Sequence, residues 1–225
     1  MKQPKITVVG LGPGRFGLIT LESWQTMQAA EHLVLRTRIH PTVAEIEKRG
    51  LTFSSYDGFY EEAPDFETLY RHIAEDLLRR ATEQGDLVYA VPGSPLVAER
   101  TVVLLRELAK ETDTAVDILP GMSFVEVMYT RLCIDPIEGL TILDAEDVST
   151  LKERPAQSLV ITQVYDPIIA SDTKLMLMEF YPDEYEVTYI HNLALPDESI
   201  RKIPLYELDR QKDVDHLTSL FVPAQ

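Results

Sequence analysis

Apolar residues in the first 120 positions alternate between short continuous runs and segments with helical spacing. The runs at 5–9, 33–35, 87–91 and 115–119 are typical of strands buried on both faces. Helical spacing predicts helices at 20–30, with Thr20 as N-cap and Leu21, Trp24, Met27 and Ala30 on one face, at 41–49, from Phe66 to Gln84, at 97–109 and after Ser123. The aromatic and acidic residues 56–67 are predicted to form a loop. This alternation of strands and helices predicts an α/β fold with a parallel sheet.

The pattern changes after about residue 140, where strands outnumber helices. Strand-like runs occupy 140–143, 158–164, 185–191 and 217–222, and a single good helix, about 167–180, lies among them. We therefore expect two α/β domains with different sheets, an N-terminal domain at 1–121 and a strand-rich domain at 122–225.

Composition narrows the classes of partner. The formal net charge of −16 argues against binding to nucleic acid or to an anionic membrane, because both require a positive surface. The one cysteine, Cys133, lies in an apolar segment and is predicted to be a core residue. No secretory signal is recognisable, and no apolar run approaches the roughly 18 residues of a transmembrane helix. We expect a cytoplasmic protein.

Three predicted strands each open onto a loop that contains glycine. The loops are Gly10-Leu11-Gly12-Pro13-Gly14, Pro92-Gly93-Ser94-Pro95 and Pro120-Gly121-Met122-Ser123. In an open α/β sheet such loops gather at the carboxyl ends of the strands, where ligands bind. Glycine lacks a Cβ, so Gly93 and Gly121 let the backbone approach a ligand closely. The sequence therefore predicts a small-molecule site at this edge.

Other kinds of site are poorly supported. Residues 12–17 match the dinucleotide pattern G-x-G-x-x-G, but the first helix cap, Thr20, comes too late to direct a helix at a pyrophosphate, and Arg36 and Arg38 stand where an acidic residue is expected. An NADP-dependent reductase stays open as a weaker alternative, as does a purely structural turn. The five histidines are scattered without metal-ligand spacing, so we expect no metal site.

The motifs together resemble the tetrapyrrole (corrin/porphyrin) methylases. The resemblance rests on Val9-Gly10-Leu11-Gly12-Pro13-Gly14, on Pro92-Gly93-Ser94-Pro95 in place of a Gly-Asp-Pro loop, on Leu119-Pro120-Gly121-Met122-Ser123 and on Leu195-Pro196-Asp197-Glu198. It implies the class III methyltransferase fold, two α/β domains with the cofactor cleft between them, and S-adenosylmethionine as cofactor. Family members are commonly homodimers, so a homodimer is expected, with Phe59 and Tyr60 at the interface or covering the substrate.

A narrower resemblance points to the methylase-like domain that precedes MazG nucleotide pyrophosphohydrolases in YabN-type proteins. The segments Tyr56-Asp57-Gly58-Phe59-Tyr60-Glu61-Glu62-Ala63 and Leu140-Thr141-Ile142-Leu143-Asp144-Ala145 carry it. It implies a C-terminal MazG domain in the full-length protein, of which this chain would be a piece.

The family resemblance also implies particular site residues. Cofactor contacts are expected at Pro92, Gly93, Ser94, Val97, Ser123, Phe124, Gln163, Val164, Leu193 and Thr218. The acceptor, a small molecule such as a tetrapyrrole, is expected to face Gly12, Pro13, Gly14, Arg15 and Tyr60. Tetrapyrrole precursors are polycarboxylates, so Arg15, Arg36 or Arg38 are candidates to pair with them, with a surface salt bridge as the alternative role of each.

Ser94 departs from the family pattern, in which this position is acidic. A neutral hydrogen bond contributes about 1 kcal/mol and a charge-assisted one roughly twice that, so cofactor affinity is expected to be weaker. The sequence therefore leaves two main hypotheses. One is an S-adenosylmethionine-dependent methyltransferase, and the other is a non-catalytic ligand-sensing module of a MazG-type fusion. No catalytic residue is identified.

Overall fold

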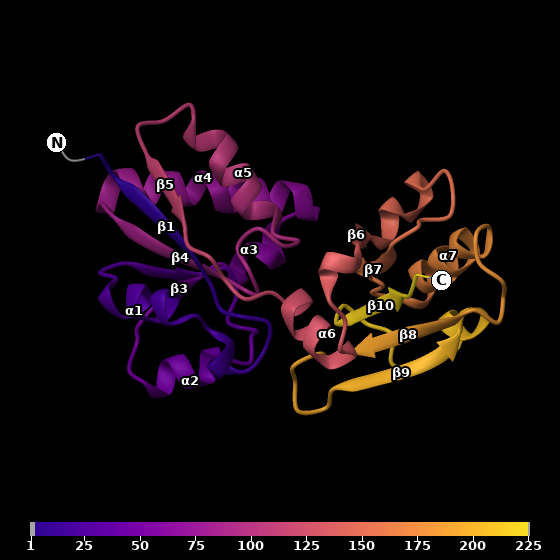
Figure 1. Cartoon of the computed structure of the whole chain (residues 1–225). Helices are drawn as coiled ribbons and strands as arrows, with labels where there is room; N and C mark the ends of the chain where they lie inside the picture. The colour runs from indigo at the N-terminus through magenta and orange to yellow at the C-terminus, as the bar shows by residue number, and fades with distance from the viewer. Residues whose placement is uncertain (1–2, 225) are drawn as a thin grey trace. The chain divides into compact units, whose positions relative to one another are not determined.

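The chain folds as two compact units, each built around its own five-stranded sheet (Figure 1). The computed structural model describes residues 3–224. The units are Met1–Val127 and Met128–Gln225, so the division falls inside helix α6 (Phe124–Leu132), whereas the sequence placed the boundary just before that helix. The α/β fold class expected from the sequence is confirmed.

Unit 1 is a parallel sheet covered by helices on both faces. Its strands, in the spatial order β3-β2-β4-β1-β5, are Ser54–Ser55, Leu33–Leu35, Leu87–Val91, Lys5–Gly10 and Ala115–Ile118. Alternate residues of β4 face opposite ways. Tyr89 packs toward the cluster of α4 and α5, and Val88 and Ala90 pack toward the cluster of α1 and α2. Burial on both faces explains why these strands read as continuous apolar runs.

The helices of unit 1 begin at identifiable caps. Helix α1 (Leu21–Ala29) starts at Thr20, whose hydroxyl accepts a hydrogen bond from the Ser23 amide, as predicted. Helix α4 (Phe66–Gln84) is capped by Asp65 and ends at Gly85. The other elements are α2 (Val43–Lys48), α3 (Asp57–Glu62), α5 (Arg100–Ala109) and the 3-10 helix η1 (Phe16–Leu18).

Three boundaries in unit 1 differ from the sequence prediction. Residues 57–62 form the short helix α3 instead of a loop; Phe59 on this helix packs against the unit 1 core, a long-range contact that local sequence does not reveal. Helix α2 starts after Thr42, which leaves Pro41 outside it. Helix α5 starts three residues later than expected because Ala98 adopts a positive φ of 53° and Glu99 caps the helix.

Unit 2 is a mixed sheet in the order β6-β7-β10-β8-β9. These strands are Leu140–Asp144, Ser158–Thr162, Thr218–Val222, Glu186–His191 and Ser199–Pro204. Only β6 and β7 run parallel, and every other neighbour is antiparallel. Because β10 runs against both β7 and β8, its first residue lies at the same edge as their last residues.

Helices cover one face of the unit 2 sheet. Helix α7 (Pro167–Met178) packs there with the 3-10 helices η3 (Ala145–Thr150) and η4 (Leu205–Arg210) over Leu159, Val187 and Leu220. A further 3-10 helix, η2 (Pro136–Glu138), precedes β6. The sequence missed β9, because Arg201 and Lys202 interrupt its apolar pattern. Such residues suit an edge strand, where charge discourages pairing with other chains.

Several burial predictions were wrong. Cys133 is exposed and is not a core residue. Leu21, predicted on the apolar face of its helix, lies on the solvent side of α1, and Phe66 is 66 % exposed and stacked on Tyr70. Trp24 does pack against the core, with its ring 5.0 Å from that of Phe16. Within residues 3–224 no helix has the length and apolar character needed to span a membrane.

Candidate functional site

Backbone contacts join the first two glycine loops at the carboxyl edge of the unit 1 sheet. The Gly12 amide donates to the Gly93 carbonyl (3.2 Å), and the Gly93 amide donates back to the Gly12 carbonyl (3.0 Å). The Leu11 amide donates to Val91 (2.8 Å) and continues the pairing from β1 and β4. The loops after β1 and β4, which the sequence predicted at the same edge of the sheet, are therefore joined by backbone hydrogen bonds.

The third loop packs against the same point through its glycine. A Cβ on Gly10 would lie 2.4 Å from the Gly93 carbonyl oxygen and 3.4 Å from the Cα of Gly121. A Cβ on Gly121 would lie 2.8 Å from the ring of Pro95. Close approach of three backbones thus requires glycine at positions 10 and 121.

Gly93 differs from these two glycines. It has a φ of +66°, and a Cβ built on it would meet no atom within 4 Å. The glycine is needed here for its backbone conformation, and the space in front of it is open. The loop therefore presents a bare backbone to a ligand at the carboxyl edge of the sheet.

The remaining cofactor residues predicted in unit 1 lie around this point. Pro92, Gly93 and Ser94 are half-buried and follow β4 directly, and the Val97 amide donates to the Ser94 carbonyl (3.2 Å), which closes a turn. Ser123 is buried, and its hydroxyl caps α6: it accepts from the Val125 amide (3.0 Å) and donates to Glu126 (2.5 Å). Phe124 is the first residue of that helix. The Ser123 side chain is thus engaged in a capping box.

The substrate residues predicted in the first loop lie beside a histidine that the sequence did not single out. Gly12 and Gly14 are buried, and Arg15 is exposed. The His40 ring lies close to the backbone of Gly12, and its Nδ1 lies 2.7 Å from Thr42 Oγ1. Burial lowers the pKa of His40 to about 4, the backbone of Gly12 opposes this shift, and the Arg36 charge adds to it. His40 is therefore neutral at physiological pH.

Next to this loop lies a buried ion pair. Arg36 follows β2 directly, and its Nη1 donates to Glu99 Oε2 at 2.8 Å. The Glu99 side chain is only 2 % exposed, and its Oε1 accepts from both the amide (3.2 Å) and the hydroxyl of Thr101. The Thr101 hydroxyl in turn accepts from Tyr89 (3.2 Å). Burial raises the pKa of Glu99, while Arg36 and Thr101 lower it.

Two tyrosines border this ion pair. Burial raises the pKa of Tyr60, and the charge of Arg36 opposes that shift; the same two effects act on Tyr70. Tyr60, which was predicted to face the substrate, is 37 % exposed. Arg38 instead pairs with Glu47 at the surface, and its guanidinium lies 5.1 Å from the centre of the Phe53 ring. Of the predicted substrate residues and arginines, Tyr60 lies near Arg36, and Gly12 lies near His40, which is itself close to Arg36.

The four cofactor residues predicted in unit 2 lie along one edge of its sheet. Gln163 and Val164 follow β7, Leu193 follows β8, and Thr218 begins β10, with Thr218 paired with His191 in register. Gln163 is exposed with a φ of +60°, whereas the other three are buried. Neighbouring Asn192 and Ala194 also have positive φ. Non-glycine residues with positive φ are strained, and such residues are common in functional loops.

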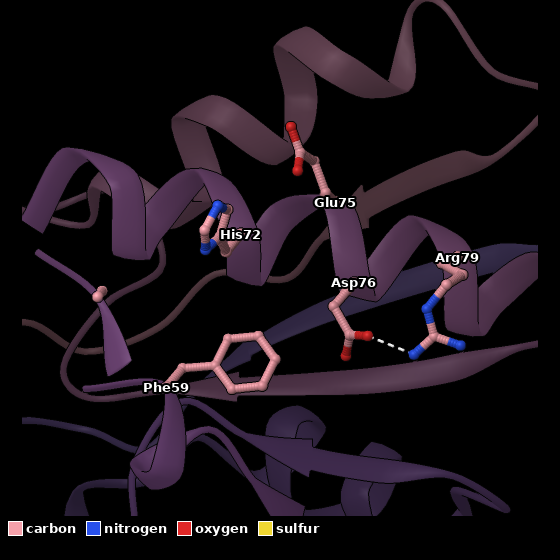
Figure 2. A pocket seen from close by; sticks show the side chains of 6 residues that line it. Phe59, His72, Glu75, Asp76 and Arg79 are labelled. Carbon is pink, nitrogen blue, oxygen red and sulfur yellow. Dashed lines mark hydrogen bonds and ion pairs between the residues drawn. The ribbon is translucent and has the colours of Figure 1, made fainter. Parts of the chain in front are cut away.

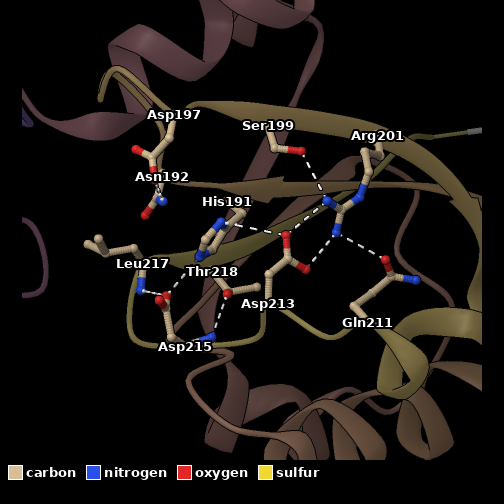
Figure 3. Close-up of polar contacts among 10 residues, drawn as sticks. All are labelled: His191, Asn192, Asp197, Ser199, Arg201, Gln211, Asp213, Asp215, Leu217 and Thr218. Atoms are coloured by element: carbon tan, nitrogen blue, oxygen red, sulfur yellow. Dashed lines mark hydrogen bonds and ion pairs between the residues drawn. The ribbon is translucent and has the colours of Figure 1, made fainter.

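A polar network supports this edge of unit 2 (Figure 3). Arg201 donates two hydrogen bonds to Asp213 (2.9 and 2.7 Å), and this pairing lowers the pKa of Asp213 to about 2. The His191 Nε2 lies 3.2 Å from Asp215 Oδ1, without the geometry of a hydrogen bond. The Asp215 amide donates to the Thr218 hydroxyl (3.0 Å). The network holds the start of β10, and with it Thr218, in place.

A pocket elsewhere in unit 1 contains none of the predicted cofactor contacts, but it is lined by Phe59, which was expected at a dimer interface or over the substrate. It is open, has a volume of about 440 Å³ and lies between α3 and α4 (Figure 2). Its lining residues are Phe59, Ala63, His72, Glu75, Asp76 and Arg79. Asp76 is engaged there with Arg79, Arg80 (2.6 Å) and the Tyr56 hydroxyl (2.9 Å). Asp76 and Arg79 of this pocket are therefore engaged in local ion pairs.

No group of three potential metal ligands occurs in the part of the chain that the structure describes. The first α-helix begins at Leu21, well after the glycine turn, as the sequence indicated. The turn therefore does not direct the start of an α-helix at a ligand, which argues against a dinucleotide.

Residues 5–209 match the family profile of the Tetrapyrrole (Corrin/Porphyrin) Methylases. The chain belongs to this family. S-adenosylmethionine is the methyl donor of these methylases, as the sequence resemblance implied. The family inferred from the sequence is thus confirmed.

A relative of this methylase-family chain is the uncharacterized protein YabN of Bacillus subtilis (strain 168), 42% identical over 219 residues. The alignment covers 97% of this chain and 45% of YabN, so the chain spans less than half the length of that relative. The YabN likeness inferred from the sequence is therefore confirmed, whereas no finding shows a MazG domain.

Solved methylase structures share the fold at low sequence identity. The methyltransferase CobJ superposes with a TM-score of 0.78 at 18% identity, over 98% of this chain and 94% of that one. The uroporphyrin-III C-methyltransferase of Thermus thermophilus, complexed with S-adenosyl homocysteine, gives 0.72 at 17% identity, over 97% and 92% of the two chains. These similarities show that the class III methyltransferase fold spans nearly the whole chain.

Sequence reasoning missed His40 and Glu99 at the site of this methylase-family chain. His40 comes four residues after Arg36, and Glu99 comes five residues after Ser94, so both follow carboxyl ends of strands. Their position relative to β2 and β4 was the available signal. Their burial depends on packing and was not readable from the sequence.

The neutral state of the half-buried His40 predicts a pH-dependent stability. Its pKa in the folded chain, about 4, lies below the ordinary value of 6.5. Between these pH values the unfolded chain binds one more proton, so stability is lost as the pH falls from 6.5 toward 4, by at most about 1.4 kcal/mol per pH unit. Urea unfolding at a series of pH values should show a shallower slope for His40→Gln.

Glu99 also affects the pH dependence of stability: because its pKa is raised in the folded chain, it opposes the effect of His40 over the same pH range. Subtracting the free energy of unfolding of His40→Gln from that of the wild type at each pH isolates the contribution of His40. His72→Gln is a matched control, because His72 is exposed on α4. A slope unchanged by His40→Gln would show that His40 is not held neutral.

Proposed function

We propose that this chain binds S-adenosylmethionine at the carboxyl edge of the unit 1 sheet and transfers its methyl group to a small-molecule acceptor. The observation that supports this most strongly is the joined glycine loops, where Gly10 packs against Gly93 and Gly121, Gly12 pairs with Gly93, and the Cβ position of Gly93 faces open space. The family match supplies the cofactor. Pro92, Gly93, Ser94 and Val97 would contact it from this edge. Ser123, Phe124, Gln163, Val164, Leu193 and Thr218 stay predicted contacts.

Methyl transfer from a sulfonium asks little acid–base work of the protein. The acceptor nucleophile displaces the thioether in line, and the thioether leaves as a neutral molecule. Holding nucleophile and methyl group in alignment therefore supplies most of the catalysis. A site made of backbone loops and a fixed ion pair suits this requirement. The loop at 10–14, with Arg15, His40 and Tyr60, would face the acceptor.

Ser94 favours a second candidate function, a module that senses the cofactor without transferring its methyl group. Its side chain makes no hydrogen bond in the described structure, and it replaces the acidic residue of the family loop. A neutral hydroxyl holds ribose or sulfonium less firmly than a carboxylate does. Fusion to a MazG domain, a homodimer and a cytoplasmic location remain predictions that accompany this candidate and the first alike.

Isothermal titration with S-adenosylmethionine and S-adenosylhomocysteine tests the cofactor. We expect one site per chain with micromolar affinity for both. The absence of heat from either ligand at millimolar concentration would remove both candidate functions. If the ligands bind, transfer of a radiolabelled methyl group to small-molecule acceptors separates them: turnover at an enzymatic rate supports the methyltransferase, and binding without turnover supports the sensing module.

A further inference from the structure

The proposed acceptor edge of unit 1 carries little free positive charge. Arg36 is paired with Glu99, Arg38 is paired with Glu47, and His40 is neutral. Of the cationic side chains at this edge that the structure describes, Arg15 alone has no ion pair. A ligand with many carboxylates would therefore find one free partner.

The groups that contact Glu99 favour its ionised form and so oppose the rise in its pKa that burial causes. Its two oxygens accept three hydrogen bonds, from the guanidinium of Arg36 and from the amide and hydroxyl of Thr101. All three groups act as donors, which favours the carboxylate over the protonated acid. Because both charges are largely removed from water, each cancels the other at close range. Glu99 therefore neutralises Arg36 and fixes the direction of its guanidinium.

We infer that the acceptor is a polar molecule with at most one carboxylate, and that Glu99 is a specificity-determining residue that excludes polycarboxylates from this edge. The inference rests on the proposed function, because it assumes that the acceptor lies beside Gly12, Arg36 and Tyr60. Moving several carboxylates of a ligand out of water requires matching cations. Arg36 and Arg38 are already paired with Glu99 and Glu47. The net charge of −16 adds a general repulsion of polyanions.

Uncharged hydrogen-bonding groups remain available at the same place. Tyr60 and Tyr70 both lie near Arg36, because its charge opposes the rise in the pKa of each phenol that burial causes. Among the side chains that the structure describes, neither phenol has a hydrogen-bond partner, and Tyr60 is partly open to solvent. Such groups bind amides, hydroxyls or amines without requiring charge. The edge thus offers polar contacts suited to a neutral acceptor.

Uroporphyrin I, which carries carboxylates on every pyrrole ring, is a stable fluorescent probe of this exclusion. We expect no saturable quenching with the wild-type protein at micromolar concentration. Glu99→Gln keeps the side-chain shape and removes the charge, so it should bind the probe at least about tenfold more tightly, and high salt should abolish the gain. Glu186→Gln is the matched control, because it removes one carboxylate from an exposed ion pair with Lys202 in unit 2; it should behave as the wild type does.

Saturable binding of uroporphyrin I by the wild-type protein, or methylation of uroporphyrinogen III, overturns the inference. An unchanged affinity in a folded Glu99→Gln variant does so as well. If that variant does not fold, the wild-type titration alone decides. Titration of the same samples with S-adenosylhomocysteine separates failure of the proposed function from failure of this inference. If the wild-type protein does not bind S-adenosylhomocysteine, the proposed function is wrong. If it binds both S-adenosylhomocysteine and the porphyrin, only the exclusion of polycarboxylates is wrong.

Discussion

Replacement of Gly93 by alanine is expected to weaken S-adenosylhomocysteine binding at least about tenfold, while the variant stays folded. The added methyl group meets no protein atom within 4 Å and enters the open space in front of the loop. A ligand seated there must move away from the backbone to accommodate it. The positive φ of +66° adds a penalty of roughly 1–2 kcal/mol to folding. Calorimetric titration measures the affinity, and thermal unfolding measures the penalty.

Gly50→Ala is the matched control for this change. Gly50 has a φ of +82°, follows α2, and would also place a Cβ in open space, so the backbone penalty is similar. This variant should lose comparable stability and keep the wild-type affinity. If Gly93→Ala binds the cofactor as the wild type does, the loop serves only as a turn, and the proposed cofactor site is wrong.

Replacement of Gly10 by alanine is expected to destabilise the fold itself by about 3 kcal/mol, at the upper end of the typical cost of overpacking. The new Cβ would lie 2.4 Å from the Gly93 carbonyl oxygen, in the contact that joins the loops after β1 and β4. Overpacking against backbone cannot be relieved by rotating a side chain. For a chain of this size, such a loss lowers the melting temperature by roughly 6–12 °C.

Gly17→Ala provides the comparison, since a Cβ there meets nothing within 4 Å. Its melting temperature should stay close to that of the wild type. A Gly10→Ala protein that melts within about 2 °C of the wild type would show that the loops separate easily, and that the close packing at Gly10 is not required.

The sequence by itself determined the α/β fold, most of its elements and the family. Strands buried on both faces, such as β1 and β4, appear as apolar runs, and helices such as α4 appear through their spacing and caps, because these signals depend on neighbours along the chain. The glycine loops were recognisable for the same reason. The short helix α3 and the edge strand β9 were missed, because Phe59 and Arg201 are stabilised by partners distant in sequence.

Only the tertiary structure decided how the residues of the candidate site are related. Arg36 and Arg38 look equivalent in the sequence, yet Arg36 is half-buried against the buried Glu99, whereas Arg38 pairs at the surface with Glu47. His40 becomes neutral because the fold buries it beside Gly12 and Arg36. Gly10, Gly93 and Gly121 acquire different roles from their contacts. The charge state of a side chain and the space around a glycine depend on which distant segments the sheet brings together. The sequence of a single chain does not show which segments become neighbours.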